Sequence, residues 1–405
     1  MRRAISLVLM FRVVGYGGLD LVMKVRWLGL RVLLNGTLSI IVWSCFASHS
    51  ASAQTPSYQV NDSHFHLTNY IQEGTDIHEF LKIMGTKVGR VAIFGIPLQQ
   101  QWSYRNDGNR APTYYLESDS PLYYYSFTDA WIAMAYNSLT KEERARFDPM
   151  ITGFNPSDMY ATDHIKRVLK AFPGVFTGIG EFSIHKEFVS AKIAGEVASL
   201  NDRALDRILD FCAESGLLVL IHNDMDTPFP KPDKPPAYLE QMRNLIKRHP
   251  GTTIIWAHTG MGRVVRPVNH HAAVLEEMLK DPAFNNLYFD ISWMEVAKYV
   301  VSSPEATKVA ADLFNRYPDR FLFGTDEVAP TNQEQYLKIY SMYGPLWKLL
   351  TPEASEKIRK LNYERLFDAA RKKVRAWERN NLGTSAKPTP APDQDIQVQN
   401  PAGPG

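Results

Sequence analysis

Short apolar runs rich in β-branched and aromatic residues recur along the middle of the chain, with helical patterns between them. There are eight such runs, and they lack the polar alternation of a strand with one face in solvent. This pattern predicts strands that are buried on both faces, as in a parallel sheet. Eight alternations of strand and helix predict an α/β fold, a TIM-type (β/α)8 barrel. The predicted strands are 58–62, 91–96, 150–154, 176–179, 217–221, 253–257, 287–291 and 321–323.

An open doubly wound sheet is the structural alternative, but no glycine-rich phosphate loop follows the first predicted strand. Several helix ends are marked in the sequence. Thr140 and Glu143 fit a capping box, and Ser303-Pro304 is a typical helix start. We expect Asn201 to cap another helix, which Gly216 ends.

The stretch 99–147, after the second predicted strand, is too long for a simple crossover and is rich in Trp, Tyr and Phe. We therefore predict a long insertion after the second strand. Its aromatic side chains either pack on the barrel rim or form a lid or substrate wall. Long loops inside compact domains are often functional, so both interpretations stay open.

The first residues have the features of an export signal. Basic residues from Lys24 precede an apolar run at 32–43, and Ala51-Ser52-Ala53 fits a small-x-small cleavage site. Residues 1–53 are therefore predicted to be an N-terminal extension and signal peptide, and translation could start at Met23. Alternatives are an uncleaved signal anchor and a lipid anchor at Cys45. We expect a secreted or periplasmic protein without stable membrane association after cleavage.

Residues 54–382 are assigned to the barrel, and the Pro-rich tail 383–405 is predicted to be disordered because it has few apolar residues. The chain has 45 basic and 43 acidic residues and a net charge of +2. This balance gives no electrostatic footprint for nucleic acid, and it neither suggests nor excludes small-molecule chemistry. We expect a small-molecule substrate and no nucleic-acid partner. A homo-oligomer stays open. Cleavage would leave Cys212 as the one thiol, so a metal site must use His and carboxylate ligands.

Ligand-type side chains stand at the carboxyl ends of five predicted strands. These ends meet at one rim of a barrel, where active sites form. Each residue alone is weak evidence, because a single strand-end His is more often structural. Together they predict a site for one or two divalent ions, with Zn²⁺ the leading candidate. The residues are His64, His66, Glu181, His222, His258 and Asp326.

The sequence resembles the amidohydrolase superfamily, particularly its amidohydrolase-related branch (amidohydrolase family 2). The resemblance extends from about Tyr58 to Phe367. One strand differs, because Gly178-Ile179-Gly180-Glu181 looks more like the fourth strand of TatD-like metal nucleases, where the glutamate is a metal ligand. The matching motifs are His64-Phe65-His66, Leu220-Ile221-His222, Trp256-Ala257-His258-Thr259-Gly260, Phe323-Gly324-Thr325-Asp326 and Asn362-Tyr363-Glu364-Arg365-Leu366-Phe367.

The resemblance implies roles for the site residues. His64, His66 and Asp326 would hold one metal, His222 and His258 a second, and Glu181 would bridge the two. A metal-bound hydroxide would attack the substrate. Asp326 would accept the proton of the attacking water and deliver it to the leaving group. With a single metal, His258 would instead be an electrophilic or acid–base group.

Neighbouring residues are candidates for substrate binding. Arg263 follows the sixth strand and could clamp a carboxylate or phosphate, or pair with an acidic loop residue instead. Asn223 and Trp293 follow the fifth and seventh strands. Asp224 and Asp290 could orient ligands.

The leading function is a metal-dependent hydrolase that acts on a small ester, lactone or amide. Nonoxidative decarboxylation of an aromatic or unsaturated acid is the alternative enzyme class, although Glu181 favours two metals over the single metal of that class. A TatD-like nuclease is disfavoured by the near-neutral charge. A catalytically silent binding barrel is disfavoured by the full set of ligand-type residues.

Overall fold

The computed structural model separates the chain into residues 1–55 and 56–405, and every described residue lies in the second unit. The signal peptide and the tail predicted above lie outside the described residues. Among the helices that are described, none has the length and apolar character needed to cross a membrane. The structure describes residues 58–382 except 70–72, 97, 100, 103–115, 118–122, 125–126, 187–197, 229, 231–233 and 264–265.

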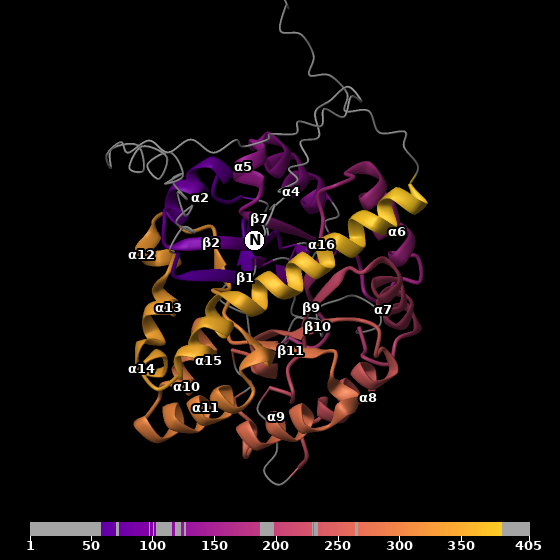
Figure 1. Cartoon of the computed structure of the whole chain (residues 1–405). Helices are drawn as coiled ribbons and strands as arrows, with labels where there is room; N and C mark the ends of the chain where they lie inside the picture. The colour runs from indigo at the N-terminus through magenta and orange to yellow at the C-terminus, as the bar shows by residue number, and fades with distance from the viewer. Residues whose placement is uncertain are drawn as a thin grey trace, which may run out of the picture. The chain divides into compact units, whose positions relative to one another are not determined.

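A parallel sheet forms the centre of the second unit (Figure 1). Within the described residues it has nine strands, in the order β12-β11-β10-β9-β8-β7-β2-β1-β13. The order follows the chain, as expected when right-handed strand–helix units succeed one another. The strands are β1 (Val60–His66), β2 (Val88–Phe94), β7 (Phe147–Ile151), β8 (Gly178–Ser183), β9 (Leu218–His222), β10 (Ile254–Trp256), β11 (Leu287–Asp290), β12 (Phe321–Leu322) and β13 (Glu327–Val328).

The two edge strands of this sheet are halves of one barrel strand. β12 pairs with β11, and β13 pairs with β1. Between them, the backbone N–H of Ser63 donates to the carbonyl oxygen of Phe323 at 3.1 Å. The ring of strands therefore closes through residues 321–328, and the predicted TIM-type barrel is confirmed.

The strand predictions differ from the structure mainly at their ends. The first predicted strand stopped at Asp62, but β1 continues to His66. Its polar residues are buried, and Asp62, His64 and His66 lie on the inward face of the strand. β7 begins at Phe147 rather than at 150, and the eighth strand is interrupted at residues 323–326.

Helices connect the strands, and most of the predicted helix ends are confirmed. Thr140 and Glu143 form the capping box, and Gly216 ends its helix with φ +80°. The predicted N-cap at Asn201 was wrong. Asp202 is the N-cap because its backbone is still extended, and the helix begins at Arg203. The longer helices are α2 (Ile77–Met84), α4 (Phe127–Ser138), α6 (Ala161–Ala171), α7 (Arg203–Ser215), α8 (Leu239–Arg248), α9 (His271–Lys280), α10 (Met294–Val300), α11 (Pro304–Arg316) and α16 (Asn362–Asn381).

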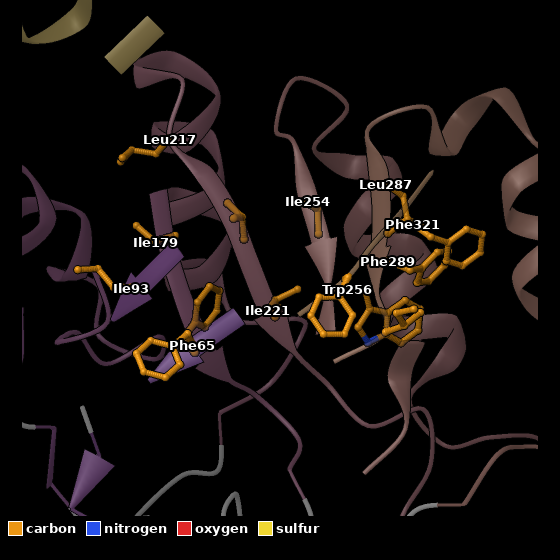
Figure 2. Close-up of a cluster of buried hydrophobic side chains, with 14 of the residues drawn as sticks. Phe65, Ile93, Ile179, Leu217, Ile221, Ile254, Trp256, Leu287, Phe289 and Phe321 are labelled. Atoms are coloured by element: carbon orange, nitrogen blue, oxygen red, sulfur yellow. The ribbon is translucent and has the colours of Figure 1, made fainter. Parts of the chain in front are cut away.

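Strand residues alternate between two apolar clusters, one on each side of the barrel wall. The outer cluster lies between strands and helices, and Figure 2 shows members such as Ile93, Ile221 and Trp256. The inner cluster contains Phe94 and Leu220. Tyr363 and Phe367 of α16 (yellow in Figure 1) also belong to the inner cluster, so α16 covers one end of the barrel.

The predicted insertion begins after β2. Its described part contains short strand pairs, β3 (Leu98–Gln99) with β6 (Tyr123–Tyr124) and β4 (Gln101–Trp102) with β5 (Leu116–Glu117). The helices α4 and α5 (Lys141–Arg144) then lead into β7. Most of the aromatic stretch lies outside the described residues, so its role as a lid or substrate wall stays a prediction.

Candidate metal centre

Strand alternation points three of the predicted histidines into the barrel. In β1, Phe65 belongs to the outer cluster, so His64 and His66 on either side of it face inward. In β9, Leu220 belongs to the inner cluster, and His222 continues that face at the end of the strand. All three imidazoles are buried.

Glu181 reaches the interior in a different way. Ile179 belongs to the outer cluster, so strict alternation would turn Glu181 outward as well. The pairing of β8 with β9 shifts register between Ile179 and Phe182, and Phe182 faces outward instead. Such an irregularity re-aims side chains next to active sites. It turns Glu181 inward, where it is 5% exposed.

His258 and Asp326 stand on turns rather than in strands. His258 lies in the short turn η2 (Ala257–Gly260) with φ +58°, and Asp326 has φ +51°. Positive φ is uncommon for residues other than glycine, and it clusters at functional sites. A buried carboxylate, Asp62, holds the second turn by accepting hydrogen bonds from Thr325 N and Oγ1 at 2.9 and 2.6 Å.

The six predicted ligands converge in two groups that share one carboxylate. In the first group, His66 Nε2 is 3.1 Å from Asp326 Oδ1 and 3.4 Å from Glu181 Oε2. His64 Nε2 is 3.2 Å from the same Asp326 oxygen. In the second group, Glu181 Oε1 is 2.6 Å from His222 Nδ1 and 3.5 Å from His258 Nε2. Within each group the candidate ligand atoms lie within 4.8 Å of one another.

In three histidines, the ring nitrogen that faces away from the ligand groups is hydrogen-bonded to another side chain. His64 Nδ1–H donates to Asp290 at 2.9 Å, and His222 Nε2–H donates to Asp224 at 2.9 Å. Ser292 gives its hydroxyl hydrogen to Asp290, so His258 Nδ1–H donates to Ser292 Oγ at 2.9 Å. Each arrangement leaves the inward nitrogen as a bare lone pair, the form that binds a metal.

The inward nitrogens are suited to bind a cation. His64 Nε2 and His258 Nε2 are buried and make no hydrogen bond within the described structure. Buried polar atoms are rarely left without a partner, so such atoms require an explanation. Imidazole and carboxylate together are a donor set for a divalent metal such as zinc. The described residues of this site therefore fit a metal ion.

The electrostatics of the site favour a bound positive charge. Burial alone would lower the pKa of His64, but the Asp326 and Asp290 carboxylates raise that pKa well above its ordinary value. Burial alone would raise the pKa of Glu181, but the Lys186 ammonium and the His222 imidazole hold it well below the usual range. The site thus keeps its carboxylates ionised, and these carboxylates favour a positive charge beside His64.

The predicted substrate-binding residues occupy different positions. Trp293, with φ +78°, packs its ring 4.9 Å from the His258 ring. The Arg263 guanidinium lies 5.6 Å from the centre of the Trp293 ring, within cation–π range. Asn223 is fully buried, and its amide donates to Asp224 O. This position suits a supporting role better than substrate contact, and all three roles stay predictions.

Sequence reasoning missed Asp62 and Ser292 as supporting residues. Lys186 comes shortly after Glu181, and the sequence left open whether it faces the substrate or begins the next helix. Asp62 is two residues before His64 in a strand, so the same alternation that placed His64 could have found it. Ser292 and the position of Lys186 Nζ, 3.3 Å from Glu181 Oε1, depend on loop geometry. No sequence pattern indicates these two contacts.

Comparison with known proteins identifies the family. The chain matches the family model described as Amidohydrolase over residues 62–369. The chain belongs to the amidohydrolase family. This assignment confirms the resemblance seen in the sequence and makes the protein an enzyme of the amidohydrolase superfamily. The TatD-like character of Glu181 stays a prediction. No curated protein matches the chain significantly.

Solved structures with similar chains are distant in sequence. An uncharacterised TIM-barrel protein from Bordetella bronchiseptica is 16% identical with a TM-score of 0.48, and the match covers 77% of this chain and 99% of that one. A probable 2-pyrone-4,6-dicarboxylic acid hydrolase from Acinetobacter baumannii is 10% identical with a TM-score of 0.45, covering 76% and 99%. A 2,6-dihydroxybenzoate decarboxylase from Rhizobium is 13% identical with a TM-score of 0.45, covering 77% and 99%.

Proposed function

We propose that this amidohydrolase is a metal-dependent hydrolase of a small ester, lactone or amide. The observation that carries the proposal is a pair of buried nitrogens, His64 Nε2 and His258 Nε2, which face Glu181 and Asp326 and make no hydrogen bond to any described residue. A hydrogen-bonded structural cluster would have satisfied them. Zn²⁺ is the proposed metal, because imidazole and carboxylate ligands suit it.

A divalent cation held by His64, His66, Asp326 and Glu181 would acidify a water molecule and polarise the bond under attack. Asp326 lies at the edge of this group, and its low pKa keeps it ionised. We assign to Asp326 the acceptance of the proton from the attacking water and its transfer to the leaving group. Burial lowers the pKa of His258, so its imidazole is neutral and can hold a proton during the reaction.

Trp293 and Arg263 are the proposed substrate contacts. The Trp293 ring covers His258, and Arg263 lies within cation–π range of that ring. A flat substrate could stack on the indole ring while the guanidinium binds an oxygen of the substrate. The same cation also suits a carboxylic acid, so nonoxidative decarboxylation is the second candidate. Export to the periplasm or outside the cell stays part of the proposal.

A substrate screen on metal-free and Zn²⁺-loaded protein tests this function. The screen covers esters, lactones, amides and aromatic carboxylic acids, with Asp326→Asn as the inactive control. We expect Zn²⁺-dependent hydrolysis that is lost in Asp326→Asn. Release of CO2 without hydrolysis would replace the proposal with decarboxylation. Hydrolysis that is equal with and without metal would overturn it.

A further inference from the structure

Lys186 lies against the carboxylate that the two ligand groups share. Its Nζ is 3.3 Å from Glu181 Oε1 and 3.4 Å from Glu181 Oε2, so the ammonium is almost equidistant from the two oxygens. The Lys186 side chain is 14% exposed and that of Glu181 is 4% exposed. An ion pair this well shielded from water is weakly screened. The shared carboxylate is therefore largely neutralised by a cation that belongs to the protein itself.

The contacts of Lys186 place it on the side of the second ligand group. Its Nζ is 5.7 Å from the centre of the Trp293 ring. That ring lies 4.9 Å from the His258 ring and 6.2 Å from the His222 ring.

The two ligand groups differ in their charge. The first group has a carboxylate of its own, Asp326, whose Oδ1 is 3.2 Å from His64 Nε2 and 3.1 Å from His66 Nε2. Among the described residues, the candidate ligands of the second group are His222, His258 and one carboxylate, the shared Glu181. The nearer oxygen of Asp326, Oδ2, is 3.9 Å from His258 Nε2. Asp224 adds a negative charge behind His222, but it faces the far ring nitrogen. A divalent ion in the second group would therefore meet a neutralised carboxylate and a nearby ammonium.

We propose that Lys186 limits the centre to one tightly bound divalent ion. This ion occupies the group formed by His64, His66, Asp326 and Glu181. The Lys186 ammonium repels a second ion from the group formed by Glu181, His222 and His258, because like charges a few ångströms apart inside a protein repel strongly. The inference revises the two-metal expectation for Glu181, and it rests on the proposed function only in requiring that a metal binds.

The number of bound ions tests the inference. The full chain, stripped of metal and dialysed against excess Zn²⁺, is compared as wild type, as the charge-removing variants Lys186→Met and Lys186→Gln, and as the charge-keeping variant Lys186→Arg. Elemental analysis gives ions per chain, and calorimetric titration gives their affinities. We expect one ion in the wild type and in Lys186→Arg. Lys186→Met removes the charge at similar length, and we expect it to approach two ions, with at least a tenfold gain in second-site affinity.

Each other outcome is decisive. Two ions in the wild type would overturn the role of Lys186 and leave the proposed hydrolase intact. No ion in any variant would overturn the proposed function as well. A single ion in both Lys186→Met and Lys186→Gln, with thermal unfolding like that of the wild type, would overturn the inference without affecting the proposed function. Two variants are used so that misfolding of one does not decide the test.

Discussion

Buried carboxylates at the two ends of the barrel have opposite surroundings. Asp148 is the second residue of β7, at the end where α16 lies, and it accepts hydrogen bonds from Arg90, Arg371 and Tyr363 at 2.6–3.1 Å. At the other end, Asp326 faces His64 and His66, and His64 Nε2 has no hydrogen-bond partner among the described residues.

The same contrast holds for histidines. His249 is buried, and its two ring nitrogens bind Asp210 and Asp206 at 2.9 and 2.8 Å. His64 Nδ1 is hydrogen-bonded to Asp290, whereas His64 Nε2 has no hydrogen-bond partner in the part of the chain that the structure describes. A polar cluster whose groups are all satisfied within the chain stabilises the fold, whereas a cluster with unsatisfied lone pairs is completed by a ligand. In an α/β barrel, active sites form at the carboxyl ends of the strands, which is the end where His64 and Asp326 lie.

The largest expected effect is a loss of activity when the cluster of His64, His66 and Asp326 is altered. Asp326→Asn removes a proposed ligand and the proposed proton acceptor together. We expect activity on an identified substrate to fall by at least about 10³-fold, within the range that a single acid–base group supplies. Zn²⁺ content should fall with it, while the free energy of unfolding of the metal-free protein changes little. Retained metal and activity would contradict the assignment of Asp326.

Asp148→Asn should produce the reverse pattern. The substitution leaves two arginines facing a neutral amide in a buried site. Breaking a buried ion pair costs about 3–5 kcal/mol, so we expect a loss of that size in the free energy of unfolding. Zn²⁺ bound per folded chain should stay at the wild-type value. Denaturant unfolding and elemental analysis measure the two quantities. A loss of metal without a loss of stability would contradict the purely stabilising role of Asp148.

Asp129 is a buried, hydrogen-bonded carboxyl group outside the metal centre, and its effect on the free energy of unfolding should depend on pH. It is buried in α4 and accepts hydrogen bonds from the backbone N–H groups of Thr152 and Gly153. Burial raises its pKa from an ordinary 3.8 to about 7, so the folded protein holds a proton that the unfolded chain loses. Its contribution to stability is present below pH 3.8 and is lost as pH rises toward about 7.

The matched variant is Asp129→Asn, which cannot titrate. Relative to the wild type, its free energy of unfolding should increase between pH 4 and pH 7 by roughly 2–4 kcal/mol. Unfolding of metal-free protein at several pH values measures this difference, and chelation removes the contribution of the metal site. A difference that is constant with pH would show that Asp129 is ionised in the fold.

The smallest expected effect is that of Asp290→Asn. Asp290 accepts a hydrogen bond from His64 Nδ1–H and also binds Ser292, which holds His258. Loss of such an orienting carboxylate typically lowers metal affinity by about 10–100-fold. Competition with a chelator measures the affinity, and Asp148→Asn is the control from the opposite end. Unchanged affinity would restrict Asp290 to a structural role.

Much of the fold could be predicted from the sequence, because eight apolar runs and helix-end residues are local signals. Alternation around Phe65 also fixes the direction of His64 and His66. Alternation alone fails for Glu181, since a register shift in β8 turns it inward. Strand alternation also cannot predict the contacts of Ser292 and Lys186, because both residues lie in loops, whose backbone has no regular period. The interrupted eighth strand follows from pairing with both β11 and β1, a long-range property.

The central claim is that the unpartnered nitrogens are completed by a metal, and stabilisation by Zn²⁺ tests it most directly. The free energy of unfolding is measured with and without Zn²⁺ for wild type, His64→Gln and His249→Gln. At 100 times the dissociation constant, Zn²⁺ should stabilise the wild type and His249→Gln by about 2.7 kcal/mol, and His64→Gln by much less. No stabilisation of the wild type, or equal stabilisation of all three proteins, would contradict the account.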